Sequence, residues 1–169
     1  MHNRRGTVQA FPVESRILRG NLPGDPCIRD LHVYLPPGYE EGNERYPVAW
    51  VLSGFTGRGR QLLNDGPWAP AINDRMDALI ASGKCRPMIL ALPDCFTHLG
   101  GSQYVNSSGL GRYEDYVIEE LVPSVDARFR TLPGPRHRGV MGKSSGGYGA
   151  ITLGMKHPET FSAIACHSG

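Results

Sequence analysis

The sequence predicts an α/β protein built on a mainly parallel β-sheet with helices on both faces. Two short segments, residues 48–53 and 87–93, are apolar on both faces, as strands buried inside a parallel sheet are. Segments with helical spacing alternate with such strands along the chain, which is the pattern of this class. A third observation is a G-x-S-x-G motif at residues 142–146, which stands between an apolar run and a segment with helical character.

Length and composition indicate one domain with a real core. The chain has 169 residues, of which 40% are hydrophobic and 20% charged, and its net charge is +2. No basic cluster indicates a nucleic-acid partner, and no apolar run has the length of a membrane span. The four cysteines lack C-x-x-C spacing, so neither a zinc site nor a disulfide framework is expected. The N-terminus lacks the pattern of a signal peptide, and we therefore expect a cytoplasmic protein.

The first elements are strands. Residues 7–20 alternate loosely between apolar and polar, which predicts a hairpin-like pair of strands. Residues 29–35 alternate more clearly and predict a further strand. His32 lies within it and is expected to be an ordinary strand residue, because no partner stands at metal-ligand spacing.

The strand at residues 48–53 is expected to lie centrally in the sheet and to stop at a glycine-flanked turn. Such a turn can present a backbone N–H to a reacting group. We assign one oxyanion donor to the N–H of Phe55 and a second to the N–H of Ser145, and we count Gly54 as a pocket residue. The alternative, that residues 54–59 only end the strand, stays open.

The middle of the chain supplies a helix, a strand and a long loop. Trp68 stands between two prolines and is a candidate pocket wall. Residues 72–81 have helical spacing, and Gly83 ends that helix. The polar loop at residues 94–111 follows the second buried strand, where binding residues often lie, and Asn106 is a candidate there.

Asp94 begins that loop. It precedes Ser144 in the chain, so we expect a structural or pocket role for it and not that of a triad acid.

Residues 113–130 form the clearest predicted helix. Apolar residues recur there every four positions, and Pro123 is expected to kink the helix because it lacks an N–H. The helix that follows Ser144 is expected to end near His157. Residues 161–166 then predict one more buried strand, after which the chain continues to His167 and ends at Gly169.

The G-x-S-x-G motif predicts a nucleophile elbow, a sharp turn that lifts a serine hydroxyl above the sheet. Ser144 is its central residue, and Gly142 and Gly146 keep its neighbours small enough for the turn. A purely structural glycine-rich turn is one alternative. A phosphate-binding loop is another, but His137 stands where the first glycine of that motif is required.

Several segments together resemble a known family. Residues 46–57, 113–130 and 140–150, continuing to residues 161–164, are similar to the "putative esterase" family of α/β-hydrolases. This family contains S-formylglutathione hydrolase, enterochelin-esterase-like enzymes and mycolyltransferases. The resemblance implies an α/β-hydrolase fold, in which residues 1–35 are N-terminal strands and residues 46–169 form a core with its elbow at 142–146.

The resemblance also implies residues that this sequence does not supply. In the family an acid and a histidine follow the nucleophile, after the next two strands. The sequence ends before both, so we expect it to be one incomplete domain, truncated after the strand that follows the nucleophile helix. His167 stands at the end of that strand and is a candidate pocket residue, whereas His157 is expected to be a helix-end residue. The family usually has histidine where this chain has Ser53.

The function implied is that of a serine hydrolase, which forms an acyl-enzyme on Ser144 with a small-molecule ester or thioester. No metal or organic cofactor is implied. Two alternatives remain: an inactive fragment or binding module of the same fold, and an acyltransferase that uses the same serine. The last strand is expected to be an unpaired apolar edge of the sheet, which favours a homo-oligomer or aggregation.

Overall fold

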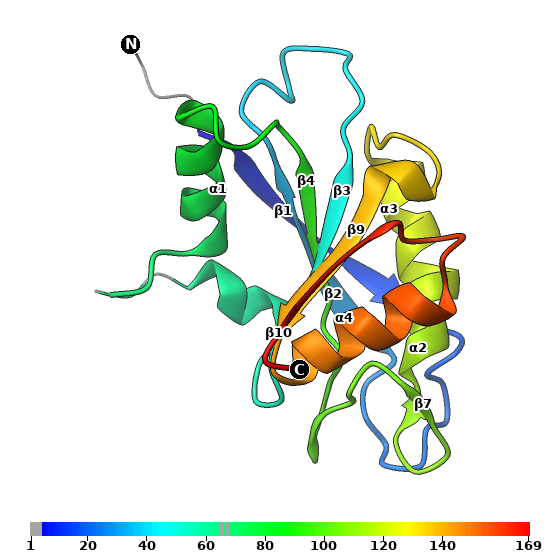
Figure 1. Ribbon diagram of the computed structural model, residues 1–169. Coiled ribbons are helices and arrows are strands. Elements are labelled where there is room, and N and C mark those ends of the chain that lie inside the picture. The colour runs from blue at the N-terminus through cyan, green and yellow to red at the C-terminus, as the bar shows by residue number, and fades with distance from the viewer. Residues whose placement is uncertain (1–4, 65, 67) are drawn as a thin grey trace.

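A computed structural model of the chain describes residues 5–64, 66 and 68–169, and the first four residues of the expected N-terminal segment 1–35 lie outside it. One six-stranded sheet organises the molecule (Figure 1), with the strand order β1-β2-β4-β3-β9-β10. Its strands are β1 (Thr7–Glu14), β2 (Ile28–Leu35), β3 (Val48–Leu52), β4 (Ile89–Leu92), β9 (Arg138–Lys143) and β10 (Ala163–His167).

The sheet is mainly parallel, as expected. β3 runs parallel to both β4 and β9, and β10 runs parallel to β9. Within the described part of this sheet, the antiparallel pairs are β1 with β2 and β2 with β4. The expected central place of residues 48–53 is confirmed, because Trp50 of β3 lies opposite Ala91 on one side and Val140 on the other.

The hairpin predicted for residues 7–20 is wrong. β1 pairs along its whole length with β2, from Thr7 opposite Leu35 to Glu14 opposite Ile28. The apolar residues that had indicated a second strand belong to a loop, in which Leu18 is fully buried in the core. Hydrogen bonds within the loop fix this conformation, since the N–H of Leu18 donates to Ser15 Oγ over 2.9 Å.

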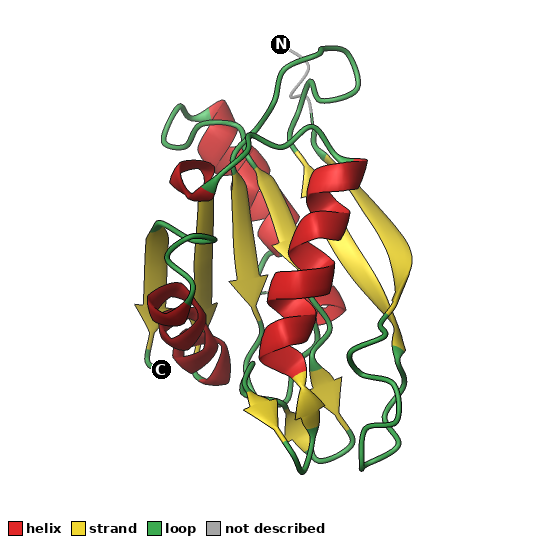
Figure 2. Ribbon diagram, turned by 90° about the vertical axis from the view of Figure 1, so that its right-hand side faces the viewer, coloured by secondary structure: helices red, strands yellow, loops and turns green. Residues whose placement is uncertain are grey.

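Helices cover both faces of the sheet (Figure 2), which confirms the expected layers. α1 (Ile72–Ala81) packs on one face, where Met76 joins Val51 and Leu90. The opposite face carries α2 (Tyr113–Asp115), the π-helical η2 (Tyr116–Leu121), α3 (Val122–Arg128) and α4 (Ser145–Lys156). Short elements fill the connections: η1 (Gly59–Leu63), η3 (Pro135–His137), β5 (Phe96–Thr97), β6 (Gly100–Gly101), β7 (Asn106–Ser107) and β8 (Gly111–Arg112).

The helix expected over residues 113–130 contains a π-helical stretch just before Pro123. Proline cannot donate to the helical ladder, and the wider turn of η2 stands where the ladder is interrupted. The apolar stripe keeps its direction through this stretch, and Val117, Leu121 and Val125 are all buried.

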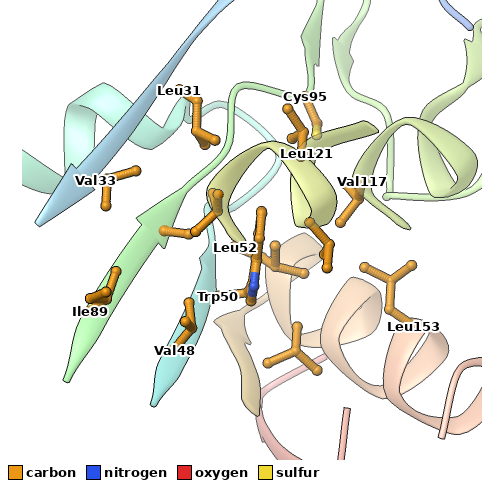
Figure 3. Close-up of a cluster of buried hydrophobic side chains, with 14 of the residues drawn as sticks. Leu31, Val33, Val48, Trp50, Leu52, Ile89, Cys95, Val117, Leu121 and Leu153 are labelled. Carbon is orange, nitrogen blue, oxygen red and sulfur yellow. The ribbon is translucent and has the colours of Figure 1, made fainter. Parts of the chain in front are cut away.

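The larger part of the core lies between the sheet and these helices. Figure 3 shows Trp50 and Leu52 of β3 facing Val117 and Leu121, with Leu153 of α4 beside them. Burial of such side chains contributes about 2 kcal/mol each relative to exposure. This packing holds α4, and with it the residue at its start, against the end of β3.

β10 is the outermost strand of the sheet, and the expectation that it is buried is wrong. Four of its five residues are exposed, and the side chain of Ile164 is 43% exposed. An edge position with apolar side chains agrees with the unpaired edge anticipated above, and self-association through it stays a prediction. Within the described residues, no helix is long and apolar enough to cross a bilayer.

An ion-pair cluster joins the start of α2 to the end of α4, and it gives stability a pH dependence. The Glu114 carboxylate, whose side chain is 9% exposed, accepts hydrogen bonds from Lys156 Nζ at 2.9 Å and His157 Nε2 at 3.0 Å. Burial alone would raise its pKa, but these two partners outweigh burial and hold the pKa of Glu114 below its ordinary value.

Replacing Glu114 by glutamine is therefore expected to lower the free energy of unfolding at pH 7 by about 1 kcal/mol. A carboxylate with a depressed folded-state pKa stabilises the fold above its unfolded-state pKa of about 4.3, and this contribution is lost as the pH falls through the folded-state value. Urea unfolding from pH 7 to pH 3 should show the two proteins converging. Glu40→Gln, at an exposed carboxylate outside this cluster, is the control, and a gap that persists at pH 3 would contradict the assignment.

Candidate active site

Ser144 lies in a sharp turn between β9 and α4, as expected of a nucleophile elbow. Its backbone adopts φ 56° and ψ −123°, a conformation that residues other than glycine rarely occupy. The turn is held from both sides: the N–H of Ser144 donates to the carbonyl of His167 over 2.9 Å, and its own carbonyl accepts from the N–H of Tyr148 over 2.9 Å. Strain of this kind costs about 1–3 kcal/mol and is concentrated at functional sites.

The two elbow glycines are required by close backbone approach. A Cβ atom at Gly146 would stand 2.1 Å from the carbonyl oxygen of Leu52, and one at Gly142 would stand 2.3 Å from the carbonyl oxygen of Gly146. Real Cβ atoms do not approach backbone atoms this closely. The glycines therefore allow the first turn of α4 to lie directly against β9 and β3.

The expected oxyanion loop is a four-residue turn after β3. The N–H of Gly57 donates to the carbonyl of Gly54 over 2.9 Å and closes the turn, so that Phe55 takes its second position. Ser53 stabilises the turn: its Oγ donates to the carbonyl of Gly57 over 2.9 Å and lies 3.1 Å from the Tyr104 hydroxyl. That hydroxyl in turn donates to the carbonyl of Ser53 over 2.9 Å.

Two backbone donors stand free beside Ser144. In the part of the chain that the structure describes, no group accepts a hydrogen bond from the N–H of Phe55 or from the N–H of Ser145. Both residues line one hollow together with Ser144. An anion formed on a group attached to Ser144 would find these N–H groups, and the N-terminal end of α4 adds a favourable dipole.

The hollow above Ser144 has a volume of about 510 Å³. Residues with strained backbone conformations cluster around this hollow. Among the described residues other than glycine, four have a positive φ, and three of these, Gln103, Ser144 and Ser168, line the hollow. The complete lining consists of Phe55, Gln103, Val105, Ser144, Ser145, Tyr148, Ser168 and Gly169.

Several residues expected near the site lie elsewhere. Trp68 is 95% exposed and does not line the hollow. Asn106 is bound to Asp115, the last residue of α2: its Nδ2 donates to Asp115 Oδ1 over 2.8 Å and its Oδ1 accepts from the N–H of Asp115. Gly54 contributes to the turn but not to the lining of the hollow.

The candidate histidine His167 contributes to the turn at Ser144 through its backbone carbonyl. Its carbonyl fixes the N–H of Ser144, whereas its side chain is exposed on β10 and does not line the hollow. His157 is bound to Glu114, as a helix-end residue would be. Asp94 has the expected structural role, since it accepts from the N–H of Phe96 over 3.0 Å and faces Arg29 at 3.4 Å.

Five lining residues were missed by sequence reasoning: Gln103, Val105, Tyr148, Ser168 and Gly169. Tyr148 carried a usable signal, because a residue four positions after Ser144 on a helix lies on the same face. The sequence held no such signal for Gln103 and Ser168, because their positions depend on positive φ angles that no local motif predicts.

The hydroxyl of Ser145 is buried, and in the described structure it has no hydrogen-bond partner. An unsatisfied buried hydroxyl costs about 1–3 kcal/mol. Ser145→Ala keeps the backbone N–H and removes the hydroxyl, so we expect the free energy of unfolding to rise by about 1 kcal/mol. Ser53→Ala removes a hydroxyl that is hydrogen-bonded, so we expect this substitution to lower the free energy of unfolding. Urea unfolding of both variants tests this contrast, and a destabilised Ser145→Ala would show that the hydroxyl is bonded.

Comparison with known proteins places this geometry in a family. The model of an esterase family, described as "Putative esterase", matches residues 26–169. The chain belongs to this esterase family. It is 30% identical over 149 residues to an endo-1,4-beta-xylanase/feruloyl esterase of Xylanibacter ruminicola, covering 84% of the chain and 20% of that protein. It is 31% identical over 141 residues to an esterase of Mycobacterium tuberculosis, covering 82% of the chain and 28% of that protein.

Solved structures of esterases share the α/β-hydrolase fold of the chain. A ferulic acid esterase superposes with a TM-score of 0.82 at 27% identity, over 95% of the chain and 59% of that structure. An S-formylglutathione hydrolase from Agrobacterium tumefaciens superposes with a TM-score of 0.72 at 25% identity, over 96% of the chain and 58% of that structure. The chain therefore spans about three fifths of these structures and between 20% and 28% of the curated relatives' length.

Proposed function

We propose that the chain carries the nucleophile and the oxyanion hole of a serine carboxylester hydrolase that acts on a small-molecule ester or thioester. The observation that carries this proposal is Ser144 itself, which has a positive φ at the start of α4. Phe55 and Ser145 line the same hollow, and among the described residues no group accepts a hydrogen bond from their N–H groups. A strained serine beside two free donors is the arrangement that acyl transfer requires.

In the proposed reaction, Ser144 Oγ attacks the substrate carbonyl and its proton passes to a histidine. The N–H groups of Phe55 and Ser145 stabilise the oxyanion, the alcohol or thiol leaves with a proton from the histidine, and water then releases the acid by the same steps in reverse. We place this histidine and its acid in the part of the family fold that the chain does not span. Membership of an esterase family supports the proposal.

The walls of the hollow favour an aromatic or otherwise apolar acyl group. Phe55 is 45% exposed and Tyr148 is 46% exposed, so both rings remain available to a ligand in the hollow, and Val105 adds aliphatic surface. Aromatic side chains contribute large apolar contact areas to binding. A ferulic acid esterase is among the similar structures, and methyl ferulate and p-nitrophenyl acetate are suitable first substrates.

A matched pair of substitutions at Phe55 tests the oxyanion hole. Phe55→Pro removes the N–H, and proline is favoured at the second position of the turn, so the turn itself should survive. Loss of one oxyanion donor is expected to lower kcat by about 100- to 1,000-fold. Phe55→Ala keeps the N–H and should act mainly on the KM for methyl ferulate. Equal kcat values for the two variants in the full-length protein would contradict the assigned donor.

A further inference from the structure

Tyr104 is buried beside the four-residue turn after β3, residues 54–57, which we call the oxyanion turn. Its backbone has a φ of 57°, in a region that a bulky side chain rarely occupies. The residue is only 3% exposed and does not line the hollow at Ser144. Strained conformations persist where the surrounding structure requires them, and the contacts of this side chain show what requires this one.

The hydroxyl of Tyr104 is bonded to the backbone at the start of the oxyanion turn. It donates to the carbonyl of Ser53, the residue before the turn, over 2.9 Å. Burial raises the pKa of the Tyr104 hydroxyl above its ordinary value, so the group keeps its proton and can donate at neutral pH. The peptide group between Ser53 and Gly54 is therefore held by this side chain.

A second contact from the same segment holds the other side of the assigned oxyanion donor. The N–H of Gly101 donates to the carbonyl of Phe55 over 2.7 Å. The N–H of Phe55 belongs to the peptide group between Gly54 and Phe55, which lies between the two peptide groups that these contacts hold. The segment 101–104 therefore fixes the backbone before and after the N–H of Phe55.

The ring of Tyr104 contacts the helix that carries the second assigned donor. A Cβ atom at Gly149 would stand 2.4 Å from Tyr104 Cδ2, so the ring lies directly against the backbone of α4. Ser145 is the first residue of that helix. One side chain thus touches the elements that supply both N–H groups. Oxyanion stabilisation depends on donors that are already in place before the reaction, so a contact of this kind bears directly on catalysis.

We propose that Tyr104 is a positioning residue of the oxyanion hole, in an inference that rests on the proposed function. Its hydroxyl acts through the N–H of Phe55 and does not touch the substrate, because Tyr104 is buried outside the lining of the hollow. Tyr104→Phe keeps the ring against α4 and removes only the hydroxyl. Misplacement of a catalytic group by about 1 Å can lower a rate about 100-fold, so we expect kcat for p-nitrophenyl acetate to fall about 10- to 100-fold. Binding of the substrate does not use the hydroxyl, and KM should change by less than about twofold.

Tyr39→Phe is the matched control in the full-length protein. The Tyr39 side chain is also buried, and its hydroxyl accepts from the N–H of Arg130 over 2.9 Å. Its ring packs on Tyr46, which precedes β3, whereas the oxyanion turn follows that strand. The control removes a bonded phenol hydroxyl at the opposite end of β3, and kcat should stay within about twofold of the wild type. An equal loss of kcat in both variants would overturn the positioning role, because it would show a general effect on the fold.

A double-mutant cycle tests whether Tyr104 acts through the N–H of Phe55. Tyr104→Phe is combined with Phe55→Pro, which lacks this N–H, and with Phe55→Ala, which keeps it. In Phe55→Ala we expect the same loss of kcat as in the wild type. In Phe55→Pro we expect a change of less than about twofold, because the group to be positioned is absent. The same loss in both backgrounds, or a loss that appears in KM alone, would overturn the proposal.

The rate of Ser144→Ala separates this inference from the proposed function. Hydrolysis of p-nitrophenyl acetate that survives Ser144→Ala would overturn the proposed function, and the positioning role would fall with it. An inactive Ser144→Ala together with a Tyr104→Phe kcat within about twofold of the wild type would overturn the positioning role alone.

Discussion

Replacing Ser144 is expected to abolish ester hydrolysis while leaving the fold intact or making it more stable. Ser144→Ala removes the nucleophile, and removal of a nucleophilic serine lowers kcat by about four orders of magnitude or more. Ser144→Gly should lower activity equally and should also relieve strain, because glycine adopts φ 56° and ψ −123° freely. We expect Ser144→Gly to be more stable than Ser144→Ala by about 1–3 kcal/mol.

The pair of variants separates chemistry from backbone strain. Turnover of p-nitrophenyl acetate measures the first effect, and urea unfolding at neutral pH measures the second. If Ser144→Ala retained a tenth of the wild-type rate, the nucleophile would be another residue. Equal stabilities of the two variants would show that the positive φ at Ser144 carries no strain.

Gly146→Ala is expected to be the most destabilising small substitution in the core of the site. Alanine is normally favoured over glycine within a helix by about 1 kcal/mol. Here its Cβ would stand 2.1 Å from the carbonyl oxygen of Leu52, a backbone atom of the central strand that cannot rotate away. Overpacking costs up to about 3 kcal/mol, and moving α4 off β3 should reach or exceed that.

Gly42→Ala provides the matched control for this change. A Cβ at Gly42 would meet its nearest atom at 3.7 Å, an ordinary contact in a surface loop. Its free energy of unfolding should stay within about 0.5 kcal/mol of the wild type. Urea unfolding of the two variants measures both free energies of unfolding. A Gly146→Ala protein as stable as Gly42→Ala would mean that α4 does not pack as closely against β3 as described.

Most of the fold was predictable because it is set by local pattern. Apolar runs identified β3 and β4, helical spacing identified α1, and small residues around Ser144 predicted a sharp turn between a strand and a helix. The hairpin at residues 7–20 was mispredicted because Leu18 is apolar for a tertiary reason: it fills the core from a loop. Burial of β10 was mispredicted because apolarity alone does not tell an edge strand from a central one.

The site was predictable only where a short motif encodes geometry. The turn at Ser144 could be predicted because its glycines are required for steric reasons within a five-residue motif. Part of the lining of the hollow comes from Gln103 and Ser168, which both have positive φ angles. Trp68 and Asn106 were plausible by residue type, but contacts made far from the motif decide their places.

The central claim is that Ser144 is the nucleophile, and adduct mapping tests it most directly. The full-length protein is treated with a fluorophosphonate, whose phosphorus a serine oxygen attacks as fluoride leaves, and the modified peptide is sequenced by mass spectrometry. The account predicts a single adduct on Ser144 that is absent from Ser144→Ala. An adduct on another residue, labelling that persists in Ser144→Ala, or no labelling of the folded full-length protein would contradict it.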